Sequence, residues 1–143
     1  MSRAVLLAGA LLVSCGGGGL HPPGDQRLAS GTWGGEDVGV IVGPAGVHVH
    51  IGCTFGDIEG EVPLDEEGRF TVDGTYVLRA FPVVTGPALP AQFSGRVQGR
   101  VLRLAVAVHD TVEQRIVALG PVSVVRGGEP ELGTCPICRG PRR

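Results

Sequence analysis

Three cysteines downstream of the N-terminal region have a spacing that indicates disulfide chemistry. Cys53 follows a run of alternating apolar residues, whereas Cys135 and Cys138 form a Cys-Pro-Ile-Cys motif near the C-terminus. Three cysteines allow one disulfide and leave one thiol over. We expect Cys53 to pair with either Cys135 or Cys138. Such a bridge would pin the C-terminal segment to the folded body, and a closed loop of roughly 80 residues stabilises by about 4 kcal/mol on the chain-entropy model.

A metal site is the alternative chemistry for the same region. Cys-Pro-x-Cys resembles the knuckle of a zinc ribbon, although the second knuckle of that family is missing here. His48 and His50 are two residues apart on an expected strand, so both imidazoles would lie on one face and could join Cys135 and Cys138 around one ion. That face is also the polar side of a half-buried strand, because apolar residues alternate with the two histidines. We therefore expect no metal and no other cofactor.

Catalytic arrangements are absent from the sequence. A thioredoxin-like redox pair needs a helix that begins at the motif, and the five residues after Cys138 leave no room for one. Glu59 and Glu61 share one face of a short run, and residues 65–67 form an acidic turn; we expect all these carboxylates to be solvated. No serine lies in a nucleophile elbow. We expect no catalytic residue and no enzymatic activity.

The elements that must position these residues are strands. From Gly31 onward the apolar residues alternate with period two, without a convincing helical period. Gly-Pro-Ala-Gly at 43–46, Asp-Glu-Glu-Gly at 65–68 and Gln-Gly-Arg at 98–100 are typical of tight turns. Residues 81–90 contain three prolines, which favours a long irregular loop over a central strand.

These runs predict seven or eight antiparallel strands joined mostly by short turns. Because each hairpin has one apolar face, the sheet must close or stack to bury that face. We expect an all-β fold, a small up-and-down β-barrel, with a β-sandwich as the alternative. Gly31-Thr32-Trp33, which precedes the first expected strand, resembles the Gly-x-Trp start of lipocalin-type barrels, a resemblance that implies a Trp33 ring plugging one end of the core.

The first fifteen residues are typical of an export signal. Arg3 precedes an apolar run from Ala4 to Val13, which is too short to span a bilayer but fits the apolar region of a secretory signal. The ending Leu-Val-Ser-Cys resembles the lipobox of bacterial lipoprotein precursors. The resemblance implies cleavage after Ser14 and attachment of acyl chains to Cys15, which anchor the protein stably in a membrane. It also places the remaining cysteines in an oxidising compartment.

The expected organisation follows from these features. Residues 1–14 form the signal peptide, 15–30 the lipidated cysteine with a flexible Gly-rich tether, 31–127 the β-barrel and 128–143 a Gly/Pro-rich tail. The expected location is the cell envelope, with the protein held by its lipid. Gly16 after the lipidated cysteine favours the outer membrane in a host with two membranes, since an Asp at that position usually retains lipoproteins in the inner one.

The amino-acid composition disfavours several classes of binding partner. The formal net charge is -2 and all twelve basic residues are arginine, so the chain as a whole has no positive excess to attract nucleic acid or anionic lipid. Aromatic residues make up only 4% of the chain, which leaves few rings for stacking on bases or sugars. The chain also resembles uncharacterised small bacterial lipoproteins, a resemblance that implies no particular activity.

Two non-catalytic functions remain as hypotheses. A hollow barrel would bind one small apolar or lipid-like ligand. We expect its lining to comprise Trp33, Phe70, Val72, Tyr76, Leu102, Leu104, Val106 and Val108. The alternative is a protein-interaction module of the envelope, an inhibitor or accessory subunit, that uses the apolar loop 81–90 as its contact.

Overall fold

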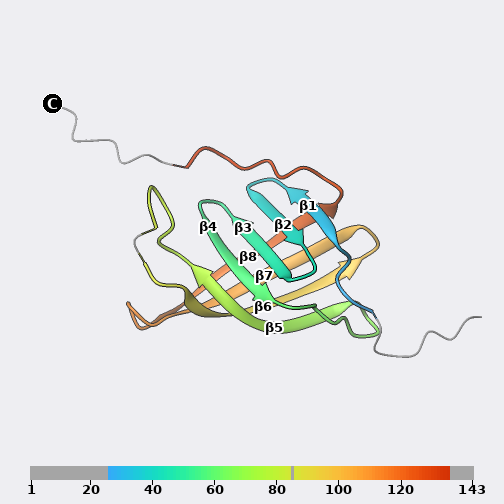
Figure 1. Cartoon of the computed structure of the whole chain (residues 1–143), viewed down its shortest axis with the longest axis horizontal. Helices are drawn as coiled ribbons and strands as arrows, with labels where there is room; N and C mark the ends of the chain where they lie inside the picture. Colours follow the sequence, from blue (N-terminus) through green and yellow to red (C-terminus); the bar gives the residue numbers. More distant parts are fainter. Residues whose placement is uncertain (1–25, 85, 136–143) are drawn as a thin grey trace, which may run out of the picture.

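A computed structural model describes residues 26–84 and 86–135 of the chain. Over these residues it contains eight strands and every strand is antiparallel to its neighbours (Figure 1). Their bounds are β1 Gly31–Gly35, β2 Val38–Val42, β3 Gly46–Ile51, β4 Thr54–Glu59, β5 Arg69–Val77, β6 Leu89–Gln98, β7 Val101–Asp110 and β8 Arg115–Arg126.

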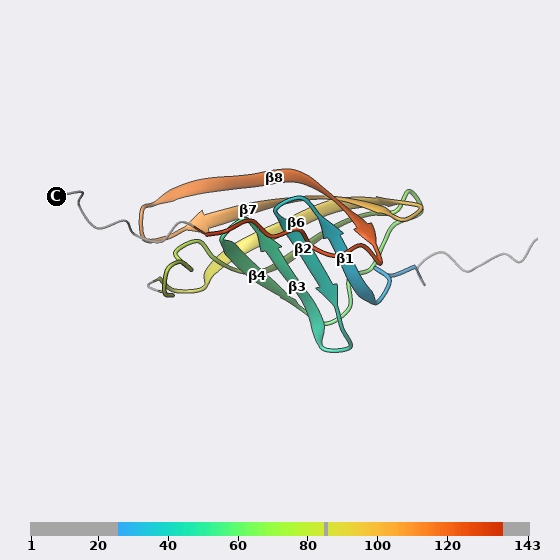
Figure 2. The ribbon, with the colours of Figure 1, turned by 90° about the horizontal axis from the view of Figure 1, so that it is seen from above.

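The strands form a closed barrel in chain order, which confirms the predicted up-and-down β-barrel rather than the sandwich. The longest pairings join β5 to β6, β6 to β7 and β7 to β8. Closure is brief, because β1 pairs with β8 only through Trp33↔Arg126 and Gly34↔Val125. Seen from above, β8 spans the long axis of the molecule while β1 to β4 are shorter and lie together (Figure 2).

Alternation along each strand places one set of side chains inside the barrel. On β7, Leu102, Leu104, Val106 and Val108 are all buried, whereas the residues between them are half-buried or exposed. Trp33 lies within β1, not ahead of it as predicted, and its buried ring donates from Nε1 to the Ala29 carbonyl at 3.0 Å. The core is therefore continuous from the first strand to the last.

The start of the barrel differs from the sequence prediction. Residues 26–30, which we assigned to the flexible tether, belong to the folded body: Leu28 is buried, and its backbone N–H donates to the Val62 carbonyl at 2.9 Å. Burial of the apolar Leu28 side chain in the core favours the folded position of this short segment. Cys15 and the remainder of the predicted tether lie outside the described residues.

Residues 127–135, which we call the strap, run along the outside of the barrel over β1 and β2 (Figure 1). Gly34 and Gly39 face each other across these strands, and a Cβ on either would collide with strap atoms of Glu129 or Pro130. The strap is also fixed by the Glu131 N–H, which donates to the Gly35 carbonyl at 3.0 Å. Two glycines therefore make room for the strap against the sheet.

Candidate interaction surface

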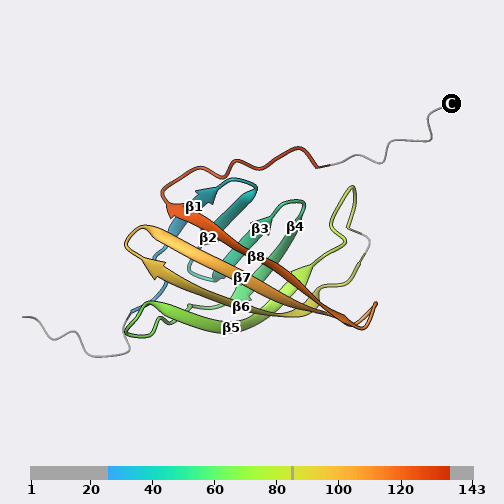
Figure 3. The same cartoon turned by 180° about the vertical axis from the view of Figure 1, so that it is seen from behind.

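The barrel has two chemically distinct ends. At one end lie the loop of residues 78–88 and the turn of residues 111–114 between β7 and β8, and we call this the loop end (Figures 1 and 3). At the other, the tether end, lie Gln26, the turn at 65–68 and the turn at 99–100. Gln26 is fixed there because its carbonyl accepts from the Leu64 N–H at 2.8 Å.

Large apolar side chains are exposed at the loop end. Val83 and Val84 on the 78–88 loop are 64% and 60% exposed, and Phe81 is 38% exposed. Val112 in the turn and Ile116 at the start of β8 are 58% and 67% exposed. Several large apolar side chains exposed at one end of a barrel favour a protein-binding surface there. We call these five residues the apolar tip.

A buried ion pair holds the two connections together. Asp110, at the end of β7, is buried, and its carboxylate accepts from Arg79 Nη2 at 2.7 Å. The same carboxylate accepts from the backbone N–H groups of Val112 and Glu113 at 3.1 and 3.2 Å. Arg79 lies near the start of the 78–88 loop, so Asp110 fixes both the base of that loop and the β7–β8 turn.

Electrostatics stabilise the charged form of Asp110. The hydrogen bonds from Arg79 lower the pKa of the Asp110 carboxyl below its ordinary value, and the backbone donors of Glu113 and Val112 add to this against the opposing effect of burial. Arg79 also pairs with Glu113 at 3.0 Å, and Arg115 pairs with Glu113 at 2.8 Å. These charges compensate one another locally, which leaves the apolar tip as the chemically distinctive feature of the loop end.

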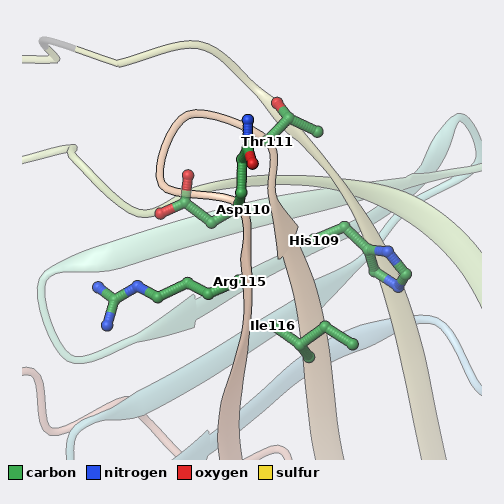
Figure 4. A pocket seen from close by; sticks show the side chains of 6 residues that line it. His109, Asp110, Thr111, Arg115 and Ile116 are labelled. Carbon is green, nitrogen blue, oxygen red and sulfur yellow. The ribbon is translucent and has the colours of Figure 1, made fainter.

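An open surface pocket of about 450 Å³ lies on the β7–β8 turn. It is lined by His109, Asp110, Thr111, Gln114, Arg115 and Ile116. His109 and Ile116 project to one side of the strand pair and Asp110 and Arg115 to the other (Figure 4), as the cross-strand pairing of His109 with Ile116 and Asp110 with Arg115 requires. The side chains do not converge, so this pocket has no arrangement for acid–base or nucleophilic catalysis.

The residues predicted to line a ligand cavity lie in the core. Phe70, Tyr76, Trp33 and the β7 residues are buried, and Val72 is partly buried against them. Of the two rings on β5, Phe70 lies over Gly95 and Tyr76 over Gly56; a Cβ on either glycine would collide with the ring opposite. Rings that fill the space left by glycines favour a packed interior.

The predicted disulfide forms, and the structure selects its partner. Cys53 is bonded to Cys135, which ties the end of the strap to the turn between β3 and β4. Cys138 lies outside the described residues. Because the sulfur of Cys135 is bonded to Cys53, it does not serve as a thiolate ligand, and the alternative metal set of His48, His50, Cys135 and Cys138 is not formed.

His48 and His50 do share one face of β3, as the spacing predicted. Their ring centroids are 5.2 Å apart, and Phe55 of β4 lies beside both. His48 Nδ1 is 2.6 Å from an Asp57 oxygen, a pairing that the β3–β4 register places directly across the sheet. Burial and the neighbouring His48 lower the pKa of His50, although Asp57 opposes this. Within residues 26–84 and 86–135, no group of three or more metal-ligating side chains is arranged to hold an ion.

Two features of the loop end differ from the sequence prediction. The irregular loop ends before Leu89, which is buried in β6, so Pro90 belongs to a strand and not to the loop. The Arg79–Asp110 pair was not predicted. A signal for half of it exists in the sequence: an Asp at the end of a strand, directly before a turn, commonly accepts from the backbone N–H groups two and three positions ahead.

Comparison with protein-family models, curated proteins and solved structures gives no match to this chain. Residues 26–84 and 86–135 contain no helix that is long and apolar enough to cross a membrane.

Proposed function

We propose that this protein is a non-catalytic lipoprotein of the bacterial cell envelope that binds another envelope protein through its apolar tip. The lipid anchor follows from the lipobox resemblance ending at Cys15. The observation that carries the binding function is the exposure of Phe81, Val83 and Val84 on one connection of the loop end, where Val112 and Ile116 are also exposed. Arg79 and Asp110 hold the two connections in place before binding, which reduces the entropy lost when a partner docks.

Packing of the barrel interior supports this function over ligand binding. The rings of Phe70 and Tyr76 occupy the space beside Gly95 and Gly56, so the apolar stripe predicted to line a cavity serves the core. Native mass spectrometry of protein purified gently from its membrane tests the ligand alternative. An apolar molecule that copurifies in a fixed ratio would favour ligand binding over the interaction function.

A loop variant tests the interaction function. We would replace Phe81, Val83 and Val84 with Ser in the full chain, cross-link in envelope membranes of the native host, and identify captured proteins by mass spectrometry. The matched control replaces Val101 and Val125 with Ser, since both are 43% exposed and pair across β7 and β8 at the tether end. A specific partner should be lost with the loop variant and kept with the control. A partner set that is unchanged in the loop variant would contradict the proposal.

The anchor is tested separately. Labelled palmitate should enter the wild-type chain and not the Cys15→Ala variant, and that variant should leave the membrane fraction. An unlabelled wild-type chain, or a variant that stays equally membrane-bound, would contradict the lipoprotein assignment.

A further inference from the structure

Three arginines stand side by side on the outer face of the barrel. In the strand register Arg69 of β5 is directly opposite Arg96 of β6, and Arg96 is directly opposite Arg103 of β7. All three are exposed. We call them the arginine row. Like charges directly opposite each other destabilise a sheet, so a row of three is a feature that folding alone does not favour.

The arginine row continues to the rim of the tether end. Arg100 in the β6–β7 turn donates to the Arg126 carbonyl at 2.7 Å, and Arg126 donates to the Ser30 carbonyl at 3.4 Å. Arg96 donates to the Glu67 carbonyl at 3.1 Å. These contacts all use neutral backbone oxygens, so the positive charges are held in place without being neutralised.

The acidic side chains that form ion pairs near this end compensate Arg69 and Arg27, and not the other arginines. Asp65 and Glu67 both pair with Arg69, and Glu61 pairs with Arg27. Within the described part of the chain, Arg96, Arg100, Arg103 and Arg126 have no acidic partner, and Arg103 has no hydrogen-bond partner either. The net charge of -2 therefore conceals a local surface of uncompensated positive charge.

The position of this surface relative to the chain start indicates its partner. Gln26 lies at the same end, because its carbonyl binds Leu64 next to the Asp65 turn that contacts Arg69. Ten residues lie between Cys15 and Gln26, and for a Gly-rich chain this length corresponds to a root-mean-square span of roughly 20 Å. A lipid on Cys15 would thus hold the arginine row close to the headgroups.

We propose that the uncompensated arginines of the row, Arg96 and Arg103, together with Arg100 and Arg126, bind the anionic phospholipid surface of the membrane that holds the protein. This proposal rests on the lipid anchor of the proposed function. The contact directs the tether end toward the bilayer. The loop end, at the opposite end of the barrel, then points away from the membrane with its apolar tip available to a partner (Figure 3).

Vesicle binding by unlipidated protein tests the surface apart from the anchor. The sample is residues 15–143 with Cys15→Ser, which include every described residue. It is sedimented with phosphatidylcholine vesicles that contain phosphatidylglycerol and with vesicles of phosphatidylcholine alone. We expect binding to the anionic vesicles only, and weaker binding as salt is added. Equal binding to both vesicle types, or none to the anionic ones, would overturn the proposal.

Matched variants locate the contact. Arg103→Gln should weaken binding to anionic vesicles about fivefold, and Arg96→Gln with Arg103→Gln roughly twenty-five-fold, since each basic residue near such a surface contributes about 1 kcal/mol. Arg115→Gln removes the same charge at the loop end and should leave binding unchanged. Equal losses for Arg103→Gln and Arg115→Gln would overturn the proposal.

A stability measurement separates this role from a structural one. Because Arg103 opposes Arg96 and has no partner, Arg103→Gln should keep or raise the unfolding temperature without vesicles. A lowered unfolding temperature with unchanged vesicle binding would make Arg103 a structural residue and contradict the proposal. Failure of palmitate labelling at Cys15 would contradict the lipid anchor of the proposed function. The vesicle experiment tests the arginines independently of that anchor.

Discussion

Arg79 and Asp110, thirty-one residues apart in the chain, form an ion pair in which the carboxylate is wholly buried and the guanidinium partly so. The pair joins the loop that carries Phe81, Val83 and Val84 to the turn that carries Val112. It therefore couples the stability of the barrel end to the geometry of the apolar tip.

Asp110→Asn should make the protein less stable at neutral pH and reduce the loss of stability in acid. The folded-state pKa of Asp110 lies below its ordinary value of 3.8, so its stabilisation is present above that value and is lost as the pH falls through the lower folded pKa. Urea unfolding of both proteins between neutral pH and the acid range measures the difference. Glu113→Gln, which keeps Asp110 ionised, is the control, and identical acid profiles for wild type and Asp110→Asn would contradict this assignment.

Tyr76 should titrate far above its ordinary pKa. Burial raises the pKa of Tyr76 to about 12 from 10.0, with the hydrogen bond to Thr54 working against this. Because the raised pKa belongs to the folded state, stability should fall between pH 10 and 12, where the unfolded chain ionises and the folded chain does not. Tyr76 is the single tyrosine, so near-ultraviolet tyrosinate absorbance reports on it alone. A folded-state midpoint near 10 would show that the ring is solvated.

Removal of the Cys53–Cys135 disulfide should lower the free energy of unfolding by about 2–4 kcal/mol. The bond closes a chain segment with a sequence separation of 82, and its loss also frees the end of the strap. Denaturant unfolding of the Cys53→Ser, Cys135→Ser double variant measures the change, with Cys138→Ser as the control. Peptide mapping that finds Cys53 joined to Cys138 would contradict the pairing.

Gly56→Ala should lower the free energy of unfolding by about 1–3 kcal/mol because the added methyl group overpacks the barrel interior against Tyr76. Gly43→Ala is the control, since a Cβ there meets only the Gly46 carbonyl oxygen at 3.8 Å, an ordinary contact. A ligand-sized cavity would absorb the extra methyl group at little cost. Equal stability of the two variants would therefore argue for a hollow interior.

Strand content and closure could be predicted from the sequence because they depend on local periodicity and turn residues. The alternation of Leu102, Leu104, Val106 and Val108 specifies a half-buried strand wherever it occurs, and apolar hairpins must close to bury that face. The disulfide partner could not be predicted, because Cys135 and Cys138 are equivalent until the strap is placed against β1 and β2.

Features that depend on register between distant strands were not accessible from the sequence. The arginine row exists only because β5, β6 and β7 align Arg69, Arg96 and Arg103, which are 27 and 7 positions apart in the printed sequence. The net charge of the whole chain does not reveal such a surface, because acidic residues elsewhere cancel its positive charge in the sum. The ordering of residues 26–30 was missed for a related reason, since a polar, Gly-rich preceding segment conceals the single buried Leu28.

The strap has a consequence for how the chain reaches its final form. β1 needs β8 to complete its strand pairing, and residues 129 and 130 cover Gly34 and Gly39. Cys53 needs Cys135 to form its disulfide. All three depend on segments that are synthesised after β7. The free edge of β1 and the outer face of β1 and β2 therefore stay uncovered until β8 and the strap have been synthesised, and the barrel cannot close before then.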